Sequence, residues 1–303
     1  MINIQYYQRV NRFKEYWIML MVIDKIRYHI KIKGEGKPII CLHGFSENLS
    51  TWDSIMLTNY QMILVDLIGH GESEKPSSRQ SYHWKIIISH LHKLIHQLGF
   101  KRYSLLGYSL GGRIALAYSL AYPREIEMLI LESASYGECG LIKRFKRRKD
   151  DSKLAKNIRQ NGIEWFNLYW SGLRIFATQT QLPRGVTGQI RKRRLANDPQ
   201  ALANTLCGSG QGKFPCLKNQ ISKLTMPVLY INGEYDTKYE QVGLEFKKLN
   251  SNIKHEIIKG VGHNTHIEDS QAFNEVLKKF LVTNFERGCT HDEVSLGNTK
   301  PKV

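Results

Sequence analysis

The sequence GYSLGG at residues 107–112 constrains the fold of this chain more than any other stretch, because it fits the pattern G-x-S-x-G around Ser109. In that pattern a strand ends, the chain turns sharply and a helix begins, so the serine hydroxyl stands over the carboxyl edge of a sheet. Glycines flank the serine because the turn leaves little room for side chains. A glycine-rich turn with a solvent serine has the same spelling, so the neighbouring segments must decide.

Short apolar runs alternate with helical patterns on both sides of this turn. Strands are expected at 26–33, 38–42, 62–65, 103–106, 128–131, 228–231 and 253–258, and helices at 82–98, 111–122, 238–249 and 270–285. This alternation predicts a mostly parallel sheet with helices on both faces. Residues 137–218 break the rhythm with helical stretches and no clear strand, which predicts a helical lid over the carboxyl ends of the strands.

The expected domain organisation is a core formed by residues 21–136 and 219–285, with the lid at 137–218 inserted into it. Residues 1–20 are expected to be a dispensable N-terminal extension, and residues 286–303 a loose polar tail. The longest early apolar run, at 17–23, is too short to span a bilayer and lacks the cleavage site of a secretory signal. A cytoplasmic protein is therefore expected.

Five cysteines form an odd, scattered set without a C-x-x-C pair: Cys41, Cys139, Cys207, Cys216 and Cys289. This spacing argues against a zinc site and against a disulfide framework, and it favours a reducing compartment. No metal and no organic cofactor are expected.

The net charge of +17 is concentrated in one region, because residues 137–218 contain 17 lysines and arginines against five acidic residues. Such a segment suits a nucleic-acid face, an anionic membrane surface or a pocket for acidic small molecules. No nucleic-acid-binding module is recognisable, so specific nucleic-acid binding is not expected. Weak electrostatic contact with an anionic membrane stays open, and the chain is expected to be a monomer or a small homo-oligomer.

A serine hydroxyl needs an imidazole to activate it, and the imidazole needs a carboxylate to orient it. Asp236 follows the strand at 228–231, and His263 follows the strand at 253–258, so the order is Ser, Asp, His. Glu132, which also ends a strand, is the alternative acid, and His266 is the alternative imidazole. Both are weaker candidates. Together these features predict the α/β-hydrolase fold.

Two backbone N–H groups are expected to form an oxyanion hole. One belongs to Leu110, directly after the serine, and the other to Phe45 in the loop His43-Gly44-Phe45. His43 and Asp66 are expected to shape their loops and to carry no proton. Arg113 lies one helical turn after Ser109 and faces the same mouth, which suits an anionic substrate better than a fatty ester. The alternative interpretation is that Arg113 has only a structural role, as a helix arginine in a salt bridge with a neighbouring side chain.

Several longer runs make the resemblance specific: GYSLGGRIALAYSLAYPREIEMLILESASYG, IEWFNLYWSGLRIF, RKRRLANDPQALANTL, PVLYINGEYDTKY and GVGHNTHIEDS. Over residues 22–282 the chain resembles the 2-succinyl-6-hydroxy-2,4-cyclohexadiene-1-carboxylate synthases, which are lyases of menaquinone biosynthesis. The resemblance implies elimination of pyruvate from a polycarboxylate substrate, with Ser109 acting as a base. It places the triad on Ser109, Asp236 and His263, the oxyanion amides on Phe45 and Leu110, the substrate-carboxylate arginines on Arg113, Arg147 and Arg194, and further pocket positions on Tyr108 and Trp170.

Three positions depart from the family pattern. Ile68 and Tyr136 stand where proline is usual, which should alter only loop stiffness, and Cys207 stands where an arginine is frequent, which would weaken charge matching to the substrate. A serine carboxylesterase or acyl-CoA thioesterase is the rival of the same fold. A non-catalytic binding module is the rival of another class.

Overall fold

The computed structural model describes residues 4–11 and 14–295, with side chains for residues 16–284. Nine strands form one sheet in the order β1-β2-β3-β5-β4-β6-β7-β8-β9. The strands are β1 (Ile4–Asn11), β2 (Lys14–Ile23), β3 (Ile26–Lys33), β4 (Lys37–Leu42), β5 (Tyr60–Val65), β6 (Tyr103–Tyr108), β7 (Ile126–Glu132), β8 (Val228–Gly233) and β9 (Ile253–Ile258). From β5 to β9 all neighbours pair in parallel, whereas β1, β2, β3 and β5 pair antiparallel. The mostly parallel sheet is confirmed.

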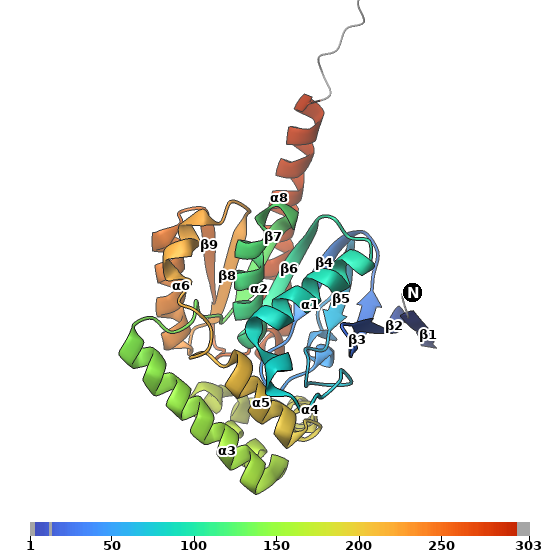
Figure 1. Ribbon diagram of the computed structural model, residues 1–303. Helices are drawn as coiled ribbons and strands as arrows, with labels where there is room; N and C mark the ends of the chain where they lie inside the picture. Colours follow the sequence, from blue (N-terminus) through green and yellow to red (C-terminus); the bar gives the residue numbers. More distant parts are fainter. Residues whose placement is uncertain (1–3, 12–13, 296–303) are drawn as a thin grey trace, which may run out of the picture.

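Helices cover both faces of the sheet, as its buried strands require. The core helices are α1 (Trp84–Gln97), α2 (Leu110–Ala121), α6 (Thr237–Leu249), α7 (Thr265–Glu268) and α8 (Ser270–Ser295). On one face α1, α2 and α6 bury a large apolar cluster that includes Leu91, Ile114 and Phe246. On the other face α8 packs Phe273 and Leu277 over a second cluster (Figure 1).

The regular elements of the lid, between β7 and β8, are all helices. It comprises α3 (Leu141–Ser171), the 3₁₀ helix η4 (Arg174–Gln181), α4 (Arg184–Leu195) and α5 (Pro199–Ser209). These helices lie together along one edge of the sheet (Figure 1). A small core of their own holds them, with Ala155, Ile158 and Phe166 of α3 packed on Leu202 and Leu206 of α5. The predicted inserted helical lid is confirmed.

The structure changes the expected boundaries at both ends of the core. β1 pairs with β2, β2 pairs with β3 from Tyr16 to Ile23, and Met19 is buried, so residues 4–11 and 14–20 belong to the sheet rather than to a separate extension. At the other end α8 continues to Ser295, since no proline interrupts the helical segment after Phe285. The predicted tail therefore begins as helix, and its remainder, 296–303, lies outside the described residues.

A disulfide joins Cys139 to Cys216, so the expectation of no disulfide is wrong. The two residues are 77 positions apart in the sequence and lie at the two ends of the lid segment. They meet because the chain leaves the sheet after β7 and returns at β8, which is the neighbouring strand. Cys41 and Cys207 are free. No helix among the described residues is long and apolar enough to cross a membrane.

Candidate active site

Ser109 occupies the sharp turn between β6 and α2 and adopts φ 50° and ψ −102°. This left-handed backbone is strained for a residue with a side chain, and its neighbours make it possible. A Cβ at Gly111 would lie 2.2 Å from the Leu42 carbonyl oxygen, and one at Gly107 would lie 2.5 Å from the Gly111 carbonyl oxygen. Glycine at these positions lets β6, α2 and β4 approach closely enough to hold the serine out over the sheet edge.

The predicted triad residues lie together at this edge. The Ser109 hydroxyl donates to His263 Nε2 at 3.2 Å, and His263 Nδ1 donates to Asp236 Oδ2 at 2.6 Å. Both Asp236 and His263 are buried. The carboxylate holds the proton on Nδ1, so Nε2 faces the serine as an acceptor. The arrangement can activate Ser109 as a base or as a nucleophile.

The alternative pair, Glu132 and His266, forms a separate buried network. Glu132 accepts hydrogen bonds from His266 Nδ1 at 2.7 Å and from the Thr265 hydroxyl at 2.7 Å. His266 Nε2 bonds to the Thr51 hydroxyl at 2.7 Å, and its ring stacks on Trp52. Neither residue bonds to Ser109 in the described part of the chain, so this pair ties the loop after β9 to the sheet.

The two expected oxyanion amides lie at the same opening. Leu110 is the first residue of α2, where the backbone N–H has no acceptor within the helix. Phe45 lies in the loop after β4 and lines the same cavity as Ser109 and Leu110. Both N–H groups are therefore available to an oxyanion above the serine.

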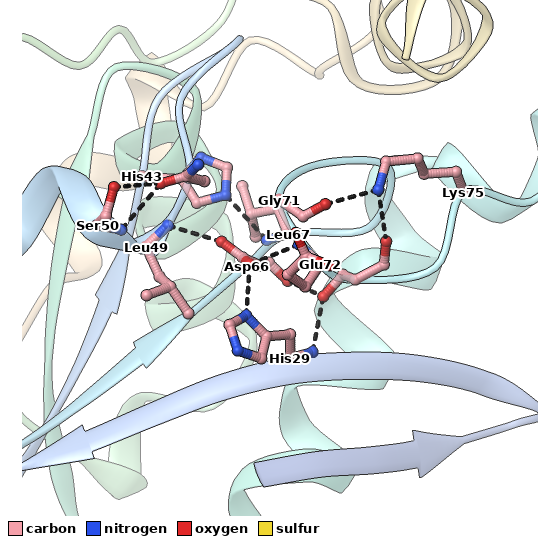
Figure 2. Close-up of polar contacts among 11 residues, drawn as sticks. His29, His43, Leu49, Ser50, Asp66, Leu67, Gly71, Glu72 and Lys75 are labelled. Carbon is pink, nitrogen blue, oxygen red and sulfur yellow. Dashed lines mark hydrogen bonds and ion pairs between the residues drawn. The ribbon is translucent and has the colours of Figure 1, made fainter. Parts of the chain in front are cut away.

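His43 and Asp66 hold the neighbouring loops, as expected (Figure 2). His43 donates from Nδ1 to the Gly44 carbonyl at 2.8 Å and accepts from the Leu67 N–H at Nε2 at 3.0 Å. Burial lowers the pKa of His43, which suits the neutral ring that this pattern requires. Asp66 accepts from the Leu49 N–H at 2.6 Å and from the Glu72 N–H at 2.9 Å. These contacts fix the loop that carries Phe45.

A cavity of about 280 Å³ opens over Ser109 beneath the lid. It brings together eight of the ten expected site residues: Ser109, His263, Phe45, Leu110, Arg113, Arg147, Tyr108 and Trp170. Asp236 bonds to His263 Nδ1, on the side of the ring away from Ser109. The lid wall includes Trp170, whose ring centroid is 5.3 Å from that of Phe45.

The three expected arginines differ in their surroundings. Arg113 is 8% exposed, burial lowers its pKa, and no hydrogen bond or ion pair reaches its guanidinium from the described residues. Arg147 lines the cavity and donates from Nε to Asp151 at 2.9 Å. Arg194 instead donates to the Ser171 hydroxyl at 2.7 Å and to Gln179 at 3.0 Å, and it lines a separate cavity of about 250 Å³. The structure thus brings two of the three arginines to the serine.

Other cavity residues were missed by the sequence reasoning. Lys238 and Tyr239 line the cavity, and the Tyr239 ring lies 4.7 Å from the His263 ring. They lie in the first turn of α6, which starts one residue after Asp236. That position was the available signal, since the first turn of this helix must face the same edge. Asp151 of α3 is buried against the cavity, and only the folded lid places it there.

The three departures from the family pattern are all accommodated. Ile68 is buried in the main core cluster. The Tyr136 hydroxyl donates to Glu245. Cys207 packs against the small core of the lid and does not line the cavity around Ser109.

These features define an α/β hydrolase: a sharp serine turn, a buried Asp–His pair and a mostly parallel sheet under a helical lid. A family model described as "alpha/beta hydrolase fold" matches residues 37–270. A Bacillus subtilis protein with the provisional name 2-succinyl-6-hydroxy-2,4-cyclohexadiene-1-carboxylate synthase is 33% identical over 88% of this chain and 98% of its own length. The Serratia proteamaculans synthase of that name is 28% identical, over 80% of this chain and 92% of its own length. The chain belongs to this synthase family.

Solved structures agree with this assignment. MenH from S. aureus superimposes with a TM-score of 0.80 at 32% identity, covering 84% of this chain and 98% of its own. The enol-lactonase from Burkholderia xenovorans LB400 superimposes with a TM-score of 0.75 at 19% identity, over 87% of this chain and 99% of its own. That second likeness shows the fold alone.

Proposed function

We propose that this protein eliminates pyruvate from 2-succinyl-5-enolpyruvyl-6-hydroxy-3-cyclohexene-1-carboxylate to give 2-succinyl-6-hydroxy-2,4-cyclohexadiene-1-carboxylate in menaquinone biosynthesis. The observation that carries the proposal is the buried Arg113, which makes no hydrogen bond or ion pair with the described residues and lines the cavity of Ser109 and His263. A buried guanidinium without a partner is costly, so a substrate carboxylate is its natural partner. The names of the relatives supply the product.

The proposed chemistry needs one base at the position of Ser109. The Ser109 hydroxyl gives its proton to His263 and takes a proton from the substrate ring. The electron pair of the broken C–H bond at C2 forms a C2–C3 double bond, the C3–C4 double bond moves to C4–C5, and the C5–O bond to the enolpyruvyl group breaks. The proton on His263 then goes to the departing enolpyruvate, which leaves as pyruvate. The 3.2 Å and 2.6 Å contacts from serine to imidazole to Asp236 support this relay.

The charge arrangement of the cavity supports a polycarboxylate over a neutral ester. Arg113 lies on the core side, and Arg147 is presented from α3 in the lid. A planar guanidinium matches a carboxylate with two parallel hydrogen bonds, which fixes orientation as well as charge. The N–H groups of Phe45 and Leu110 would donate hydrogen bonds to the oxyanion that develops during elimination. Tyr108 and Trp170 would form the walls.

The test is pyruvate release from the enolpyruvyl substrate beside hydrolysis of a p-nitrophenyl ester and an acyl-CoA. Ser109→Ala is expected to abolish pyruvate release, and wild type to turn over the two esters only feebly. Ser119→Ala is the matched control, because Ser119 is a buried serine of the same helix α2 whose hydroxyl lacks a partner among the described residues. Brisk ester or thioester turnover without pyruvate would replace the lyase by the hydrolase of the same fold.

The proposed compartment is the cytoplasm, since the relatives are named as enzymes of small-molecule biosynthesis. The disulfide between Cys139 and Cys216 is unusual for that compartment, where glutathione keeps most thiols reduced. Thiol trapping in acid-quenched cells tests this directly, because a reduced pair takes up two alkylating groups that a disulfide does not.

Weak contact with an anionic membrane is proposed as a secondary property. Leu141, Ile142 and Phe145 in the first turns of α3 are 87%, 86% and 71% exposed, and Lys146 and Lys149 are exposed beside them. Apolar side chains flanked by lysines suit the surface of an anionic bilayer. Co-sedimentation with phosphatidylglycerol vesicles should fall with salt and with Phe145→Ser. Equal binding by neutral vesicles would contradict an electrostatic contact with the membrane. The oligomeric state is a separate question, and light scattering on the same sample distinguishes a monomer from a small homo-oligomer.

A further inference from the structure

We propose a binding site for a divalent transition-metal ion, formed by His92, His96 and Glu125, away from the catalytic cavity. His92 and His96 are four residues apart on α1, so they lie on the same face of the helix, one turn from each other. Glu125 ends the short 3₁₀ helix η3 (Pro123–Glu125) immediately before β7. Since Ser109 follows the carboxyl end of β6, which is parallel to β7, the cluster and the active site lie at opposite edges of the sheet.

The ligand atoms have the spacing that a shared ion requires. His92 Nε2 lies 3.1 Å from Glu125 Oε1, and His96 Nε2 lies 3.2 Å from Glu125 Oε2. One ligand atom from each residue lies within 4.8 Å of the other two. Ligands held about 2.0–2.1 Å from a tetrahedral ion are about 3.3 Å apart, so only small side-chain movements are needed to close on an ion.

A second layer of contacts orients these ligands. The buried Tyr103 hydroxyl donates to Glu125 Oε2 at 2.6 Å, and the Tyr118 hydroxyl in turn bonds to Tyr103 at 2.5 Å. The His92 ring stacks on Tyr122 with 3.9 Å between the ring centroids. The carboxylate and one imidazole are therefore positioned from the core side before any ion binds, as in metal sites whose ligands are held by outer hydrogen bonds.

The donor set selects the class of ion. Two imidazole nitrogens and one carboxylate suit Zn²⁺, Co²⁺ or Ni²⁺, whereas Mg²⁺ and Ca²⁺ prefer oxygen donors alone. The side chains of His92, His96 and Glu125 are 27%, 44% and 23% exposed, so an ion can enter from solvent. Three protein ligands leave a fourth position for water or for a group from another molecule. The same contacts could instead be ion pairs between protonated imidazoles and Glu125, which the experiment distinguishes.

The experiment is calorimetric titration of the metal-free full-length protein with Zn²⁺, repeated with Co²⁺ to record the visible absorption of a tetrahedral site. Wild type is expected to bind one ion at this site. His92→Phe retains the stacking on Tyr122, His96→Gln changes the most exposed ligand, and Glu125→Gln retains an acceptor for Tyr103. Each is expected to weaken binding at least about tenfold, and Tyr103→Phe by about 10-fold through the lost outer contact.

The matched control is His83→Gln, which removes an exposed histidine at the N-terminus of the same helix and is expected to leave binding unchanged. Circular dichroism and thermal unfolding without metal verify that each variant is folded, and His96→Gln keeps the test valid if His92→Phe is unstable. Equal Zn²⁺ affinity in wild type and the His92→Phe/His96→Gln double variant would overturn the proposal. Absence of binding to wild type would also overturn it and leave Glu125 as the acceptor of two imidazole ion pairs.

Discussion

Replacing Arg113 with methionine should make the ligand-free protein more stable and the enzyme much less active. The guanidinium is 8% exposed, and the described residues offer it neither a hydrogen bond nor an ion pair. The guanidinium instead makes a cation–π contact with the Phe214 ring, with 5.6 Å between the guanidinium carbon and the ring centroid. A buried ion without a partner costs several kcal/mol, and a well-packed apolar side chain of similar length removes that cost.

The gain in the free energy of unfolding should be about 2 kcal/mol, which for a domain of this size raises the Tm by about 3 °C. Loss of a buried charge pair to the substrate should cost about 3–4 kcal/mol in the transition state, or about 10²–10³-fold in kcat/KM. Urea unfolding of the ligand-free protein and steady-state pyruvate release measure the two effects. A polycarboxylate such as succinate should raise the Tm of wild type more than that of the variant.

Arg147→Met is the matched control, because Arg147 is half-buried and already paired with Asp151. Its removal leaves Asp151 without its partner, so the ligand-free protein should not become more stable. If Arg113→Met unfolds at lower urea concentration than wild type, then Arg113 has a structural partner and its role as a waiting carboxylate ligand is refuted.

Three further predictions concern stability. Burial lowers the pKa of His70 to about 3, so below pH 6.5 the unfolded chain binds a proton that the folded chain does not. Lowering the pH from 6.5 to 5 should therefore reduce the free energy of unfolding by about 2 kcal/mol. In urea titrations, His70→Asn should flatten the dependence of this free energy on pH, and an unchanged dependence would assign it to other groups. The free energy of unfolding of the Cys139→Ser/Cys216→Ser variant should be about 2–4 kcal/mol lower than that of the oxidised protein. A reductant should lower the urea midpoint of the wild type and leave that of the variant unchanged. Gly111→Ala places a Cβ 2.2 Å from a backbone oxygen and should lower the free energy of unfolding by about 2–3 kcal/mol. Gly185→Ala, with open space around the new Cβ, should cause no measurable loss in the same unfolding assay.

The sequence predicted the sheet and the meeting of Ser109, Asp236 and His263 because both depend on local patterns in a fixed order. The apolar runs at 38–42, 103–106 and 228–231 correspond to β4, β6 and β8. The positions of Asp236 and His263 follow from the strand ends before them. β1 and β2 were missed because they join the sheet through antiparallel pairing, β1 with β2 and β2 with β3, a contact that local pattern does not reveal.

Features made by distant contacts could not be predicted in the same way. Cys139 and Cys216 meet only because β7 and β8 are neighbours in the sheet. Arg194 is conspicuous in a basic run, yet its hydrogen bonds to Ser171 and Gln179 depend on how the lid helices pack. The His92–His96 pair is visible on α1, but its acid comes from another element.

The most direct test of the proposed role of Ser109 is its chemical state during turnover. Wild-type enzyme would be quenched in acid while it releases pyruvate from the enolpyruvyl substrate, and its intact mass measured. We expect the unmodified mass throughout, because a serine acting as a base forms no bond to carbon. An added mass that appears during turnover, maps to Ser109 and is absent from Ser109→Ala would show a covalent intermediate and contradict elimination by this serine acting as a base.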